Sequence, residues 1–209
     1  METTPQLWAI TGMSGSGKSF VAHALQQMLP IPAVIFEQDH YYKKIHFQQK
    51  DENGITNFDL PEAMDLKKYT QDVHKLLRRE QVTQDRYHYN QPITDGIFKV
   101  HYFPKPLVIS EGIFSLHPPE IKGRANVKIF VETPLSLALA RRLKRDCSER
   151  GYGRESILYQ FEQHAKPCYQ KYILPLKDEA DVVIDNSKDQ PHLMNQLNKI
   201  KASFQQEFT

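Results

Sequence analysis

The stretch that most limits how this chain can fold is 12–19, which reads GMSGSGKS. It matches the pattern G-x-x-x-x-G-K-S/T of phosphate-binding loops. The apolar run 7–11 precedes it as a short predicted strand, and apolar residues at helical spacing follow it up to Pro30. The motif therefore lies between a strand and a helix N-terminus, which is the setting in which it binds phosphate.

The residue types of this loop predict its chemistry. Glycines allow backbone conformations in which successive N–H groups turn toward an anion, and the helix N-terminus adds unpaired donors. Lys18 supplies a positive charge for the outer phosphates, and the Ser19 hydroxyl is a ligand for Mg²⁺. The loop predicts a bound nucleoside triphosphate and leaves the reaction open. The residues expected to bind it are Gly12, Met13, Ser14, Gly15, Ser16, Gly17, Lys18, Ser19 and Phe20.

Five short apolar segments predict the fold class. They are 7–11, 33–36, 106–110, 127–131 and 180–184, and they alternate with helical stretches. This alternation is typical of an α/β fold in which helices cover both faces of a parallel sheet, here of the phosphate-loop NTPase type. The 209 residues are the length of one domain, so we expect 1–209 to be a single domain.

Two further elements are predicted between the second and third apolar segments. The segments 82–89 and 97–102 are rich in β-forming residues and flank the turn sequence 94–96, which predicts a β-hairpin over about 82–102 that projects from the main sheet. Upstream of it, 59–62 (DLPE) resembles the capped start of a helix that continues to about Arg79.

Two acidic residues directly follow predicted strands. Asp39 comes after 33–36, and Glu111 comes after 106–110. Ligands of parallel sheets bind beyond the carboxyl ends of the strands, so we expect both acids beside the phosphate loop. Glu111 is a candidate Mg²⁺ ligand, and Asp39 is a candidate base for an attacking hydroxyl that also reaches the metal through water. The alternative for each acid is a helix cap or a loop salt bridge.

A dense basic run follows the fourth predicted strand. It contains Arg141, Arg142, Lys144, Arg145, Arg150 and Arg154. One interpretation is a solvated helix face, neutralised by Asp146 and Glu149. The interpretation that we favour is a helical lid over about 141–155, because arginine binds phosphate oxygens in bidentate geometry and a closed lid excludes water from the transfer.

Overall charge and hydropathy exclude several partners. The net charge is +2, which gives no electrostatic argument for nucleic-acid binding. No apolar run approaches 18 residues, and the N-terminus lacks the pattern of a signal peptide, so we expect no membrane contact and a cytoplasmic location. Cys147 and Cys168 have no metal-like spacing and are expected to be free thiols.

Several motifs together resemble the uridine (uridine–cytidine) kinases of the phosphoribulokinase/uridine kinase family. The resemblance extends over most of the chain, and RDxSERG is its most specific part. The matching stretches are 12–19, 38–42 (QDHYY), 57–59 (NFD) with Pro61, 110–113 (SEGI), 141–142 (RR), 145–151 (RDCSERG), 166–167 (KP) and 180–184 (ADVVI).

The resemblance implies transfer of a phosphate from ATP or GTP, with Mg²⁺, to the 5′-hydroxyl of a nucleoside, by a protein that is a homo-oligomer. It implies Asp39 as the catalytic base, with Lys18, Arg142 and Arg145 acting on the phosphates, and Ser19, Glu111 and Asp39 next to the metal. The substrate contacts that it implies are Asp39, Tyr42, Phe58, Asp59, Tyr87, Arg142, Arg150 and Gln160.

Two positions depart from the family pattern. Pro92 stands where the hairpin of a uridine kinase usually offers a histidine to the pyrimidine, and Tyr152 stands where many lids carry an arginine. Proline offers neither a side-chain donor nor a backbone N–H. The acceptor therefore stays open between a pyrimidine nucleoside and, as a second hypothesis, a sugar phosphate, another riboside or a vitamin precursor. A third alternative, from another class, is a nucleotide-binding regulator without catalysis.

Overall fold

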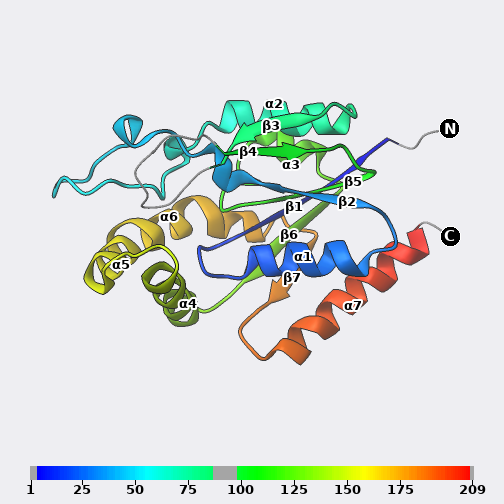
Figure 1. Cartoon of the computed structure of the whole chain (residues 1–209). Helices are drawn as coiled ribbons and strands as arrows, with labels where there is room; N and C mark the ends of the chain where they lie inside the picture. Colours follow the sequence, from blue (N-terminus) through cyan, green and yellow to red (C-terminus); the bar gives the residue numbers. More distant parts are fainter. Residues whose placement is uncertain (1–3, 87–97, 208–209) are drawn as a thin grey trace.

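The computed structural model describes residues 4–86 and 98–207. A five-stranded sheet forms its centre, with strand order β2-β5-β1-β6-β7 and every neighbouring pair parallel (Figure 1). Each predicted apolar segment overlaps one of these strands, so the predicted α/β architecture is confirmed. The strands are β1 (Gln6–Gly12), β2 (Ala33–Glu37), β5 (Leu107–Glu111), β6 (Val127–Glu132) and β7 (Val182–Asp185).

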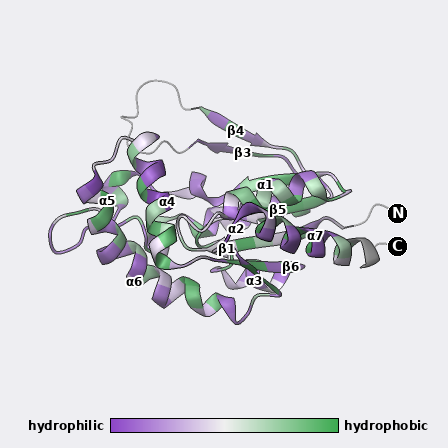
Figure 2. Cartoon of the chain, turned by 90° about the horizontal axis from the view of Figure 1, so that it is seen from below, coloured by the Kyte–Doolittle hydropathy of each residue, from purple (hydrophilic) through white to green (hydrophobic). Residues whose placement is uncertain are grey.

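Helices cover both faces of the sheet because successive strand residues point to opposite sides. Leu7 and Ala9 of β1 pack in the core under α2 (Leu66–Leu77) and α3 (Pro119–Arg124). Trp8 and Ile10 pack on the other side against α1 (Lys18–Met28) and α7 (Gln190–Glu207). Figure 2 shows the hydrophobic colour along the central strands, whereas α7 alternates between hydrophobic and hydrophilic residues.

A third group of helices lies beyond the carboxyl ends of the strands. α4 (Leu135–Ser148) is followed by α5 (Arg154–Gln160), α6 (Lys166–Cys168) and intervening π-helical turns. A separate apolar cluster, which includes Met13, Phe130 and Phe161, packs these helices against the end of the sheet. The short turns are η1 (Gln38–Tyr41), η2 (Ile45–Phe47), η3 (Pro61–Ala63), η4 (Phe161–Ala165), η5 (Tyr169–Ile173) and η6 (Leu174–Lys177).

The predicted hairpin is present at its base. β3 (Val82–Asp85) and β4 (Lys99–Tyr102) pair antiparallel in a separate two-stranded sheet, with Val82 opposite Tyr102. The segment 87–97 lies outside the described residues. It includes Tyr87, a predicted substrate contact, and Pro92, which departs from the family pattern.

The predicted helix start at 59–62 is wrong. Pro61–Ala63 is a single 3₁₀ turn, and α2 begins at Leu66, where the Asp65 side chain accepts a hydrogen bond from the Lys68 backbone N–H at 2.9 Å. Asp59 is thereby released from capping and is buried instead. Among the helices of residues 4–86 and 98–207, none is both long and apolar enough to cross a membrane.

Candidate active site

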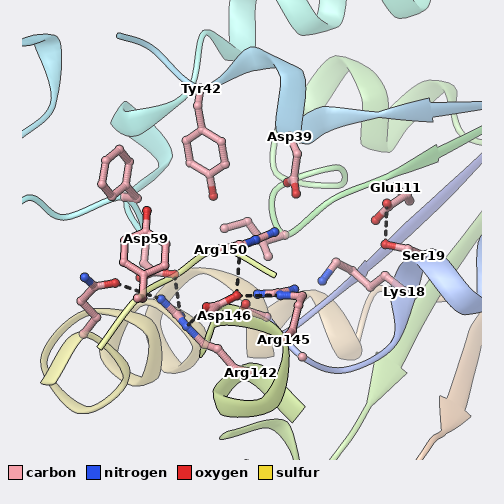
Figure 3. Close-up of a pocket in the computed structure, with 16 residues that line it drawn as sticks. Lys18, Ser19, Asp39, Tyr42, Asp59, Glu111, Arg142, Arg145, Asp146 and Arg150 are labelled. Carbon is pink, nitrogen blue, oxygen red and sulfur yellow. Dashed lines mark hydrogen bonds and ion pairs between the residues drawn. The ribbon is translucent and has the colours of Figure 1, made fainter. Parts of the chain in front are cut away.

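The strand order brings the motifs to one edge of the sheet. β5 lies between β1 and β2, so the phosphate loop after β1, Glu111 at the end of β5 and Asp39 just beyond β2 come together. They line one pocket with residues from α4 and α5 (Figure 3). Its lining residues are Ser14, Gly15, Lys18, Ser19, Asp39, Tyr42, Phe58, Asp59, Glu111, Ile113, Arg142, Arg145, Asp146, Arg150, Tyr152 and Gln160.

The phosphate loop depends on a conformation that only glycine adopts easily. Gly15 has φ 83°, and a Cβ there would lie 2.4 Å from the carbonyl oxygen of Ala138 on α4. Lys18 is buried, and its Nζ donates a hydrogen bond to the Met13 carbonyl oxygen at 3.0 Å, across the loop. Burial lowers the pKa of Lys18, while Glu111 and Asp39 oppose that shift. The hydrogen bond to Met13 therefore fixes the ammonium group of Lys18 within the phosphate loop.

A cluster of oxygen atoms lies next to the loop. The Ser19 hydroxyl donates to Glu111 Oε1 at 2.8 Å, and the Glu111 residue is only 7% exposed. Burial and, after it, the negative charge of Asp39 raise the pKa of Glu111 to about 7, while Lys18 opposes the shift. A hydroxyl beside two crowded carboxylates suits a hard divalent cation such as Mg²⁺, which would relieve their repulsion. These residues fit the predicted metal site.

Three arginines of the basic run gather around one buried carboxylate. Asp146 is 3% exposed, and its Oδ1 lies 2.8 Å from Arg145 Nε and 3.2 Å from Arg150 Nη1. Its Oδ2 lies 3.4 Å from Arg142 Nε. These arginines thus line the pocket instead of forming a solvated face (Figure 3). From the sequence, Asp146 is expected only to neutralise the basic run; the available signal for its place in the site is an acid amid basic residues.

The other end of the pocket combines an ion pair with aromatic rings. Asp59 Oδ1 lies 3.6 Å from Arg142 Nη1, and both residues are buried. Gln160 Oε1 accepts a hydrogen bond from Arg142 Nη2 at 3.4 Å. The rings of Tyr42 and Phe58 meet edge to face, with centroids 6.1 Å apart. This end of the pocket therefore combines polar side chains with two aromatic rings. Such a combination is suited to a sugar ring that bears a flat base.

The remaining predicted residues lie elsewhere. Gly12, Met13, Ser16 and Gly17 shape the loop without lining the pocket. Phe20, predicted to contact the nucleotide, is 45% exposed on α1 and is not among the lining residues. Ile113 and Tyr152 also line the pocket, although the sequence predicts no contact role for either of them. Ile113 follows the Glu111-Gly112 pair, and that proximity was the signal available for it.

Comparison with known proteins identifies the family of the chain. The profile of the phosphoribulokinase / uridine kinase family matches residues 7–191. The uridine kinase of Geobacillus sp. (strain WCH70) is 33% identical over 186 residues, which cover 88% of this chain and 87% of that protein. The uridine kinase of Aliivibrio salmonicida (strain LFI1238) is 32% identical over 180 residues, which cover 84% and 83% of the two chains.

Solved structures show the same fold. The phosphoribulokinase from Rhodobacter spheroides superimposes with a TM-score of 0.64 at 18% identity, covering 87% of this chain and 70% of that one. At that identity the likeness concerns architecture alone. The family profile and the sequence relatives lead to one conclusion: the chain belongs to the phosphoribulokinase / uridine kinase family and is a phosphotransferase with an alcohol acceptor.

Proposed function

We propose that this protein transfers the γ-phosphate of ATP or GTP, with Mg²⁺, to the 5′-hydroxyl of a pyrimidine ribonucleoside, uridine or cytidine, as in pyrimidine salvage. The observation that carries the proposal is the buried Asp59–Arg142 pair in the aromatic end of the pocket, opposite the phosphate loop. A carboxylate held in this way can accept hydrogen bonds from both the 2′- and 3′-hydroxyls of a ribose.

The donor half of the site supports the transfer. Backbone N–H groups of the loop and the buried Lys18 would bind the β- and γ-phosphates. Ser19 and Glu111 would hold Mg²⁺, with Asp39 nearby, and the metal when bound would neutralise charge on the phosphates. Arg142, Arg145 and Arg150 would contact the transferring group from the lid.

Asp39 is the proposed catalytic base. It lies in the pocket between the acceptor residue Tyr42 and the loop residue Lys18 (Figure 3). Its carboxylate would accept the proton of the nucleoside hydroxyl as that oxygen attacks the γ-phosphorus, while the bond from phosphorus to the leaving oxygen breaks. Lys18 and the loop donors would stabilise the negative charge that stays on the nucleoside diphosphate.

Charge at the acceptor end favours a neutral riboside over a sugar phosphate. Arg142 is the basic residue in contact with Asp59, and it also contacts Asp146 and Gln160. An acceptor that already carries phosphate would meet the Asp59 carboxylate, at a cost in repulsion. The sugar-phosphate alternative therefore remains second. A non-catalytic regulator is third, because Lys18, Ser19, Asp39 and Glu111 all line one pocket.

An acceptor screen tests the proposal. Purified protein with Mg-ATP or Mg-GTP would be offered uridine, cytidine, adenosine, nicotinamide riboside, pantothenate and ribulose 5-phosphate, with nucleoside diphosphate release and product mass as readouts. We expect turnover with uridine or cytidine. Silence with both, alongside activity with another acceptor, would overturn the pyrimidine proposal. Tight ATP binding without turnover on any acceptor would favour the regulator.

The oligomeric state, partners and location of the enzyme are further parts of the proposal. By likeness to its family we propose a homo-oligomer that works on a small-molecule nucleoside, without nucleic-acid or membrane partners, in the cytoplasm. Light scattering on the purified protein tests the first point, and cell fractionation tests the last.

A further inference from the structure

A polar turn at Asp51 lies outside the pocket. Asp51 Oδ1 accepts hydrogen bonds from the backbone N–H groups of Asn53 and Ile55, each at 2.9 Å. A bridge between Lys50 and Thr56 closes the turn into a small antiparallel loop. One oxygen of the carboxylate is thereby used to shape its own segment.

The second oxygen of Asp51 contacts the helical region far along the sequence. Oδ2 accepts a hydrogen bond from the Tyr159 hydroxyl at 2.8 Å and lies 2.7 Å from His164 Nε2. Asn53 Nδ2 donates to the same Tyr159 hydroxyl at 2.6 Å. Tyr159 and His164 also pack edge to face, with ring centroids 5.8 Å apart. We call Asp51, Asn53, Tyr159 and His164 the clasp.

Each side of the clasp lies next in sequence to residues that we propose to bind the phosphate-accepting substrate. Downstream of the turn, the Asn57 side chain accepts a hydrogen bond from the Asp59 N–H at 2.9 Å, next to Phe58. On the helical side, Gln160 directly follows Tyr159. Residues 48–60 contain no helix or long strand of their own, so contacts with the rest of the protein decide where Phe58 and Asp59 lie.

The loop has a second anchor at its base. Gln48 is buried, and its Nε2 donates to the carbonyl oxygens of Lys43 and Ala63 at 2.8 and 3.0 Å. That anchor fixes where the loop leaves and rejoins the body, but it does not reach the helical region. Figure 1 shows the cyan loop extending on the same side of the molecule as α5.

We propose that Asp51 is a positioning residue for the acceptor: through Tyr159 and His164 it holds Phe58 and Asp59 in register with Gln160 and Arg142. The inference rests on the proposed function. The clasp touches neither the phosphate loop nor Asp39 in the contacts described, so its loss affects acceptor binding and spares donor binding. An acceptor pocket assembled in advance binds without the entropy cost of ordering a loop.

Three variants test the clasp. Asp51→Ala removes both halves of the contact, Tyr159→Phe removes only the hydroxyl and keeps the ring, and Asp51→Asn keeps an acceptor for the turn. We expect the acceptor KM to rise about tenfold in Asp51→Ala and less in the other two, the usual scale for one charge-assisted hydrogen bond. The KM for ATP and kcat should stay within about twofold. Glu52→Ala, an exposed carboxylate on the same turn, is the matched control.

A double-mutant cycle separates the clasp from a general loss of structure. Because Asp51 and Tyr159 act through one contact, Asp51→Ala with Tyr159→Phe should raise KM no more than Asp51→Ala alone. Additive effects of the two substitutions would overturn the proposal. So would an equal rise of both KM values, because that would indicate a structural role spread over the whole site.

Hydrogen exchange keeps the inference independent of acceptor identity. In Asp51→Ala the amides of 55–59 should exchange at least about tenfold faster, while those of the phosphate loop stay unchanged. If wild-type protein turned over neither uridine nor cytidine, the proposed function would fail, and the exchange rates would still decide the clasp. Unchanged exchange in 55–59 would overturn the clasp even in an active uridine kinase.

Discussion

Asp146 Oδ1 accepts a hydrogen bond from Arg145 Nε at 2.8 Å, inside a pocket that three arginines line. The carboxylate is buried and also contacts Arg142, one helical turn before it, and Arg150, four residues after it. Its backbone carbonyl accepts a hydrogen bond from the Tyr152 N–H at 3.0 Å. Asp146 thus orients three arginines of the pocket and ties the loop after α4 to that helix.

Removing the charge of Asp146 should impair transfer more than donor binding. In Asp146→Asn the arginines lose their shared anion, and a small misplacement of groups on a transferring phosphate costs rate steeply. We expect kcat to fall about 10- to 100-fold while the Kd for ATP changes by less than about threefold. Steady-state kinetics and calorimetry measure the two quantities.

Glu149→Gln is the control for Asp146, because it removes an exposed carboxylate from the same basic run. It should leave kcat within about twofold, as surface substitutions usually do. Equal kcat values for Asp146→Asn and Glu149→Gln would refute the orienting role of Asp146.

Substitutions of Lys18 and Asp39 should distinguish the part of the site that binds ATP from the part that activates the acceptor. Lys18→Ala removes the buried cation of the phosphate loop, so both ATP binding and turnover should be lost. Asp39→Asn removes the proposed base but leaves the loop intact, so kcat should fall about 100- to 10,000-fold with ATP binding nearly intact. Near-normal turnover in Asp39→Asn would rule out Asp39 as the base.

Much of the fold was predictable because it depends on local patterns. Buried parallel strands are short apolar runs, and their carboxyl ends share one edge whatever their order. Asp39 and Glu111, 72 positions apart, could therefore be predicted to lie near one loop from their places after strands. The strand order itself has no local signature, because any of several orders would satisfy the same apolar pattern.

Other features depend on contacts between distant residues. The stretches at Asp59 and Asp65 both read Asp-Leu followed by a helical-looking sequence, yet only Asp65 caps a helix. The local signal is stronger at Asp59, where Pro61 and Glu62 follow, yet the Asp59 side chain lies in the pocket, 3.6 Å from Arg142 Nη1. The contact of Asp51 with His164 spans 113 positions, and no spacing rule links such residues.

Gly15 should not tolerate a side chain, for two separable reasons. Its φ of 83° is strained for alanine, and a Cβ would lie 2.4 Å from the backbone oxygen of Ala138. Gly15→Ala should lower the free energy of unfolding by about 1–3 kcal/mol and weaken ATP binding. Gly54→Ala is the control, since Gly54 has φ 76° but no atom within 4 Å of its Cβ position. Urea unfolding should show the smaller loss for Gly54→Ala, and equal losses would exclude the clash with α4.

Glu111 should make the metal-free protein less stable as the pH rises. Burial, together with Asp39, raises the pKa of Glu111 from 4.5 to about 7, so between these values the folded state holds a proton that the unfolded state has lost. Stability contributed by that proton is present below pH 4.5 and is lost as the pH rises through 7. Glu111→Gln should therefore increase the free energy of unfolding by about 3 kcal/mol at pH 8 and by much less at pH 4.5. Urea titrations in EDTA measure the difference, with Glu149→Gln as the control. Glu111→Gln should also abolish turnover at both pH values, because it removes the proposed Mg²⁺ ligand. A gain in stability independent of pH would show that the pKa of Glu111 is the same in the folded and unfolded protein, and would overturn this prediction.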